Sequence, residues 1–108
     1  MIIKAAEIER KHPGTARTVG AALANYVTPN SIVDFKGFIN INNSAIDEFV
    51  RVFIEKYGKE KFDTLKFINT NDLLDAILKK VRNRRINNAK KHLNVSRWRN
   101  IKFSPIVT

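Results

Sequence analysis

The chain has no cysteine, and it also lacks long apolar runs. Without thiols it can form no disulfide, no cysteine nucleophile and no cysteine-ligated zinc or iron–sulfur centre. No apolar stretch approaches the roughly 18 residues of a membrane helix. The first eight residues are too short and too charged for the apolar region of a signal peptide. From these absences we expect a soluble protein of the cytoplasm.

Acidic side chains are missing from the last part of the chain. The 108 residues carry 20 Lys and Arg against 10 Asp and Glu, so the net charge is +10. All ten acids lie in residues 1–75, where an equal number of bases balances them, and residues 76–108 carry only bases. The sequence therefore predicts a neutral domain, residues 1–82, followed by a basic C-terminal extension, residues 83–108.

The pattern of apolar residues predicts alternating strands and helices. Strands are expected at residues 2–8, 31–38 and 65–68, which are short apolar runs bounded by polar or turn-forming residues. Apolar residues at helical spacing predict helices at 16–27 and 44–57 and another from about residue 71, which continues into the basic extension. This alternation with short links is typical of an α/β fold, in which helices cover a sheet.

The central stretch, residues 32–49, resembles a known family. It reads Ile-Val-Asp-Phe-Lys-Gly-Phe-Ile-Asn-Ile-Asn-Asn-Ser-Ala-Ile-Asp-Glu-Phe, and its matching residues are Asp34, Phe35, Gly37, Ser44, Asp47 and Glu48. Residues 14–20 and 61–69 resemble the start of the family's first helix and the segment leading into its last core strand. Over roughly residues 2–82 the sequence is similar to the STAS-like domain family of unknown function. That family is a distant relative of the STAS domains found in anti-sigma-factor antagonists and sulphate transporters.

The resemblance implies a small mixed β-sheet packed by helices, and docking onto a partner protein. In the anti-sigma-factor antagonists an ATP-binding kinase partner phosphorylates a serine at the start of the helix after the central strand, and this switches docking off. Ser44 is the matching position and the candidate phosphorylation switch, although the residues before it are asparagines where the antagonists have an acid. The implied docking surface comprises Asn42, Asn43, Asp47, Glu48 and Arg51, and the implied partner is an ATP-binding, kinase-like regulator.

Ser44, Asp34 and Arg17 also have structural explanations. Ser44 and Asp47 fit a capping box, in which the serine hydroxyl accepts the N–H of Asp47. Asp34 is either a ligand-facing carboxylate at the carboxyl edge of the sheet or the cap of the following turn. Arg17 lies in the first turn of a helix, where a cation is unfavourable, so we expect it to pair with Asp34 or Asp47 or to bind an anion.

No group of residues forms a recognisable catalytic, metal or cofactor site. Residues 14–20 lack the Gly-Lys-Ser/Thr ending of a phosphate loop. His12 and His92 have no serine or acid at the spacing of a catalytic triad. We therefore expect a protein that is not an enzyme and that uses no cofactor.

The basic extension supports an alternative function, nucleic-acid binding through residues 79–103. The candidate contacts are Arg82, Arg84, Arg85, Lys90, Lys91, Arg97, Trp98 and Arg99. Lysine and arginine side chains can neutralise phosphates, and Trp98 can stack on a base. The same residues can also dock onto an acidic protein surface, with Trp98 and Phe103 as anchors, or can simply form a solvated basic helix.

Overall fold

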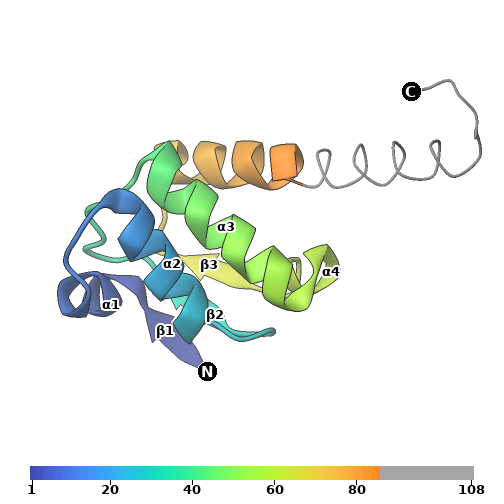
Figure 1. Ribbon diagram of the computed structural model, residues 1–108, viewed down its shortest axis with the longest axis horizontal. Coiled ribbons are helices and arrows are strands. Elements are labelled where there is room, and N and C mark those ends of the chain that lie inside the picture. The colour runs from blue at the N-terminus through green and yellow to red at the C-terminus, as the bar shows by residue number, and fades with distance from the viewer. Residues whose placement is uncertain (86–108) are drawn as a thin grey trace, which may run out of the picture.

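The structure, a computed structural model, describes residues 1–85 and confirms the α/β class. The elements in chain order are β1 (Ile2–Lys4), α1 (Ala5–Lys11), α2 (Ala16–Tyr26), β2 (Ile32–Asp34), α3 (Asn43–Tyr57), α4 (Lys59–Phe62) and β3 (Lys66–Ile68) (Figure 1). After β3, residues 72–85 form a last helix, called the 72–85 helix below. The part of the predicted extension beyond residue 85 lies outside the described residues.

Within residues 1–85 the sheet has three short strands in the order β1–β2–β3, and both pairings are parallel. Ile3 lies beside Val33, which in turn lies beside Phe67. The expected mixed sheet is therefore wrong for residues 1–85. The physical reason is that helices connect each strand to the next, and such crossovers bring the chain back to run in the same direction.

Helices α2 and α3 lie over one face of the sheet, and the 72–85 helix runs along the top of the view, beside the start of α3 (Figure 1). The core between these layers is apolar and includes Leu23, Val33, Phe49, Phe53 and Val81, all almost completely buried. Removing this surface from water is the main source of stability. On the opposite face, Ile2 and Ile68 are exposed.

Two of the predicted strands end earlier than expected. The strand predicted to reach Ile8 stops at Lys4, because Ala5 begins α1, whose buried residues recur at helical rather than alternating spacing. The strand predicted to reach Phe38 stops at Asp34, whose side chain accepts the backbone N–H of Lys36 at 2.9 Å. Asp34 thus caps the following turn, which is one of the two roles predicted for this residue.

Helices α2 and α3 come unusually close at Gly20. A Cβ atom added at Gly20 would lie 2.1 Å from the backbone carbonyl oxygen of Ala45 and 3.0 Å from Cβ of Glu48. Only glycine allows this approach. The contact sets Arg17, one turn earlier on α2, beside the first turns of α3.

Candidate functional site

Ser44 is exposed in the first turn of α3. The N-cap of this helix is Asn42, whose side-chain oxygen accepts the N–H of Ala45 at 2.9 Å. The predicted capping box of Ser44 and Asp47 is wrong, because Asn42 takes the capping position two residues earlier. Within residues 1–85, the Ser44 hydroxyl has no hydrogen-bond partner in the protein and faces solvent.

A buried carboxylate holds the loop between β2 and α3. Glu9 of α1 is only 8% exposed. It accepts the backbone N–H groups of Ile39 at 3.0 Å and Asn40 at 2.9 Å, and the side-chain amide of Asn40 at 2.6 Å. A buried carboxylate is costly unless it is hydrogen-bonded, so these contacts fix the loop to α1. The fixed loop exposes 82% of Ile39, the most exposed large apolar side chain of the described residues.

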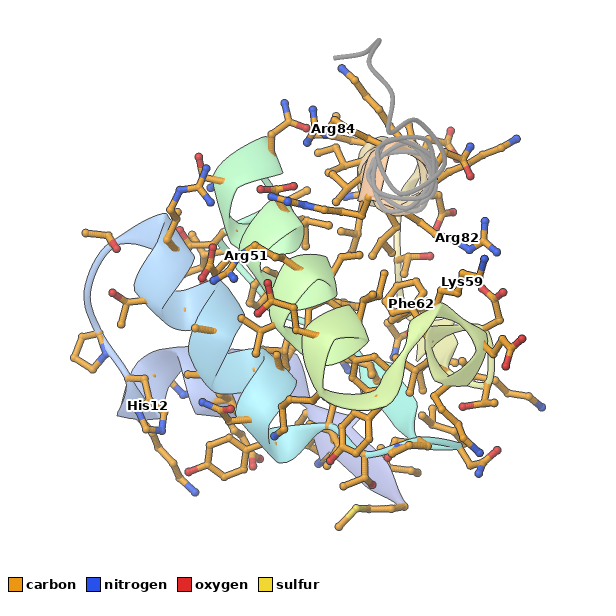
Figure 2. All side chains as sticks on the ribbon, turned by 45° about the vertical axis from the view of Figure 1, so that its right-hand side comes forward. His12, Arg51, Lys59, Phe62, Arg82 and Arg84 are labelled. Atoms are coloured by element: carbon orange, nitrogen blue, oxygen red, sulfur yellow. The ribbon has the colours of Figure 1, made fainter. Side chains whose placement is uncertain are left out.

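Three arginines of the described segment, residues 1–85, converge on Asp47, whose side chain is 8% exposed. Arg85 donates Nε to Oδ1 at 2.9 Å and Nη2 to Oδ2 at 2.5 Å, and Arg84 donates Nη2 to Oδ1 at 3.2 Å. Arg17 of α2 donates Nη1 to Oδ2 at 3.5 Å. Figure 2 shows Arg84 on the side of the 72–85 helix that faces α3. Asp47 therefore ties together α2, α3 and the 72–85 helix.

The arginines decide the protonation of Asp47. Burial alone would raise the pKa of this carboxyl group, but the hydrogen bonds and charges of Arg85 and Arg84 outweigh burial and hold the pKa below its ordinary value. Asp47 is therefore ionised at neutral pH. Of the two carboxylate partners that the sequence left open for Arg17, the structure selects Asp47.

Glu48 and Arg51 form a second group of ion pairs beside the first. Arg51 donates to Glu48 and also, at 2.9 Å, to Glu55, while Arg17 donates to Glu48 at 3.1 Å. The hydrogen bond from Arg51 is the main reason that the pKa of Glu48 is lowered. The predicted docking residues Asp47, Glu48 and Arg51 thus come together, but they bind other groups of the same chain. Of the predicted docking residues, only Asn43 is exposed, and the predicted switch residue Ser44 is exposed next to it.

The described arginines of the predicted nucleic-acid surface are also paired. Arg82 contacts both oxygens of Asp63 at 2.7 Å, on the side of the 72–85 helix toward α4 (Figure 2). Arg84 and Arg85 bind Asp47, so two residues beyond the predicted domain boundary at residue 82 contact α3. The other candidates lie outside the described residues: Lys90, Lys91, Arg97, Trp98 and Arg99. Nucleic-acid binding stays a prediction.

Glu9 belongs to the candidate site, and the sequence interpretation missed it. Its signal was present: in α1 it follows Ile8 and lies four residues after Ala5, so an acid stands on an otherwise apolar face. Such an acid must find hydrogen-bond donors inside the protein. Which donors these are depends on the loop that reaches α1 from 30 residues later, and no local pattern reveals that contact.

The carboxyl edge of the sheet carries a small hollow of about 150 Å³, lined by residues that include Lys4, Arg10, Asp34 and Lys36. Asp34 accepts a hydrogen bond from the side-chain amide of Asn69 at 2.8 Å as well as the backbone N–H of Lys36. These contacts lower the pKa of Asp34. Among residues 1–85, no three His, Asp or Glu side chains are close enough together to hold a metal ion.

Comparison of the chain with protein-family models, curated proteins and solved structures found no match. In the residues that the structure describes, the fold and the site define a small α/β protein with a three-stranded parallel sheet and an ion-paired cluster at the start of α3. The STAS-like relationship stays a prediction. In the described part of the chain, none of the helices combines the length and apolar character that crossing a membrane requires.

We expect acid to destabilise the fold through the carboxylates paired with arginine. The pKa values of Asp47, Glu48 and Asp63 are lowered in the folded protein, so near pH 4 the unfolded chain binds more protons. The free energy of unfolding therefore falls as the pH drops from about 5, above the ordinary values of these groups, through their folded-state values. Urea unfolding at a series of pH values measures this. A stability that stays constant between pH 5 and pH 3 would contradict it.

Proposed function

We propose that this protein is a non-enzymatic regulatory module of STAS-like type that docks onto a partner protein. It docks through the loop before α3, residues 35–42, called the docking loop below, and through the first turn of that helix. The observation that carries the proposal is Ile39, an exposed apolar side chain on a loop fixed by the buried Glu9. A fixed loop loses little conformational freedom on binding, and an apolar anchor on it can fill a pocket of the partner. Asn43 and Ser44 supply polar groups for the rim of such an interface.

The proposed partner is an ATP-binding regulator of the histidine-kinase-like ATPase type, as the resemblance implies. Ser44 is the proposed switch, and its exposed hydroxyl in the first turn of α3 supports this role. A phosphoryl group there adds a charge of about −1.5 to −2 close to the docking loop. We propose the cytoplasm, where such a regulator meets ATP, as the compartment.

Replacing Ile39 by aspartate should weaken partner binding at least about tenfold, because a charge cannot enter the partner's apolar pocket. Stability should stay close to that of the wild type, since Ile39 buries little of its surface in the fold. The measurement is a binding titration of the full chain with the purified histidine-kinase-like ATPases of its native host, together with a thermal melt.

The matched control for this substitution is Leu73→Asp. Leu73 is also exposed, but it lies at the start of the 72–85 helix rather than on the docking loop. Its replacement should leave binding unchanged. Equal affinities for the wild type and the Ile39→Asp variant, or equal losses in both variants, would refute the proposed docking surface.

A further inference from the structure

We propose that Arg17 and Arg84 form a clamp for a phosphoryl group beside Ser44. The proposal deepens the proposed function and rests on it for one source of that group, the phosphoserine. A phosphoryl group can also come from free phosphate, and the chemistry of the clamp is the same for both sources.

The two arginines have donors to spare. A guanidinium carries five N–H donors. In the described part of the chain, Arg17 donates through Nη1 to Asp47 and Glu48, and Arg84 donates through Nη2 to Asp47. Within residues 1–85, no hydrogen-bond acceptor contacts Nε or Nη2 of Arg17, or Nε or Nη1 of Arg84. Their side chains are also open to solvent, 57% exposed for Arg17 and 46% for Arg84.

Arg85 differs from these two and serves as the structural anchor. It donates through two nitrogens to both oxygens of Asp47. It is also less exposed than Arg17 and Arg84. Asp47 therefore stays paired when a ligand engages the other two arginines.

Ser44 lies on the same side of α3 as the carboxylates that hold the clamp. It precedes Asp47 by three residues and Glu48 by four, and residues at these helical spacings have Cβ atoms about 5–6 Å apart. Arg17 is bound to both carboxylates, and Arg84 to Asp47. We therefore expect a phosphoryl group on Ser44 to reach the spare donors.

The charge of the cluster favours an anion. The charged groups that meet at this point are Arg51, Asp47, Glu48 and Glu55 of α3, Arg17 of α2, and Arg84 and Arg85 of the 72–85 helix. Among residues 1–85, four guanidinium groups face three carboxylates at this point, so within the described part of the chain one positive charge is uncompensated. Phosphate oxygens accept two parallel hydrogen bonds from a guanidinium, a geometry that Arg provides and Lys does not.

The phosphoserine arises by phosphoryl transfer from ATP. Oγ of Ser44 forms a bond to the γ-phosphorus, and the bond between that phosphorus and the oxygen bridging to the β-phosphate breaks. ADP leaves with the electron pair, and the hydroxyl proton passes to solvent. The product carries its phosphoryl group at the start of α3, where the clamp is expected to bind it.

The first experiment uses the full chain with phosphoserine incorporated at position 44. Phosphorus NMR at a series of pH values measures the second pKa of the phosphoserine. An unstructured phosphoserine has a second pKa near 6. The neighbouring Asp47 and Glu48 alone would raise this pKa, whereas the clamp lowers it below the value for the same chain unfolded in urea. Arg17→Gln and Arg84→Gln should each bring the phosphoserine pKa part of the way back up. Arg82→Gln, which removes an arginine bound to Asp63, should have no effect.

The second experiment titrates inorganic phosphate into the unphosphorylated full chain. Binding that weakens in Arg17→Gln and Arg84→Gln but not in Arg82→Gln identifies free phosphate as a ligand and supports the clamp. The proposal is overturned when the phosphoserine pKa is not lowered and inorganic phosphate does not bind. Neither experiment needs the partner, so their failure can be told apart from failure of the docking proposal. If Ile39→Asp leaves partner affinity unchanged, docking through the loop is refuted and the clamp is not affected.

Discussion

Replacing Gly20 by alanine should lower the free energy of unfolding by about 3 kcal/mol, at the upper end of the usual cost of overpacking. The added Cβ would lie 2.1 Å from the carbonyl oxygen of Ala45. That oxygen belongs to the backbone of α3 and cannot rotate away, so the two helices must move apart. The loss is expected even though alanine is the better helix former by about 1 kcal/mol. Urea unfolding of the two proteins measures the difference.

The control is the opposite exchange at the next position, Ala21→Gly. Ala21 is only partly buried, so this variant should lose no more than the helix propensity of alanine, about 1 kcal/mol. A Gly20→Ala protein as stable as the wild type would contradict the close approach of α2 and α3. The position of Arg17 beside α3 would then need a cause other than the glycine contact.

Replacing Asp47 by alanine should cost about 3 kcal/mol, the low end of the range for breaking a buried ion pair. The substitution leaves Arg84 and Arg85 without their carboxylate, and Arg85 is mostly covered. The low end applies because Arg17 and Arg84 still reach water. Urea unfolding at pH 7 measures the cost.

Asp63→Ala is the matched control for Asp47→Ala. Asp63 binds Arg82 at 2.7 Å through both oxygens, but its side chain is half exposed. Exposed pairs contribute little, so this variant should lose less than about 1 kcal/mol. If both alanine variants lose the same free energy, burial does not distinguish the two pairs and Asp47 does not anchor the 72–85 helix.

The sequence predicts the long helices well, because their apolar faces repeat. The helices expected at residues 16–27 and 44–57 are α2 (Ala16–Tyr26) and α3 (Asn43–Tyr57). The short elements are harder, since three strand residues or four helical residues are too few to show a period. The residues that begin α1 were therefore assigned to the strand expected at residues 2–8, and α4 was not predicted. The direction of the strands depends on contacts between distant residues and not on local pattern.

The site was only partly predictable for a related reason. The charged residues at the start of α3 were named as part of a docking surface, which stays a prediction, and Arg17 was expected to need a carboxylate, which it has. The sequence could not show that Arg84 and Arg85, 37 and 38 residues after Asp47, return to bind it. Two capping patterns also overlap at this helix start: Asn42 and Ser44 can each reach an N–H three residues later, and only the backbone conformation decides in favour of Asn42.

The parallel sheet has a consequence for the order of folding. Ile3 pairs with Val33 and Val33 with Phe67, so each pairing joins residues at least 30 positions apart. The entropy of closing such loops is lost before the strand contacts form, which slows folding relative to a helical bundle of the same size. During synthesis from the N-terminus, β1 and β2 can pair before β3 has left the ribosome. Of the three described arginines that bind Asp47, Arg17 alone is then available until residues 84 and 85 emerge, so the cluster at the start of α3 is completed late.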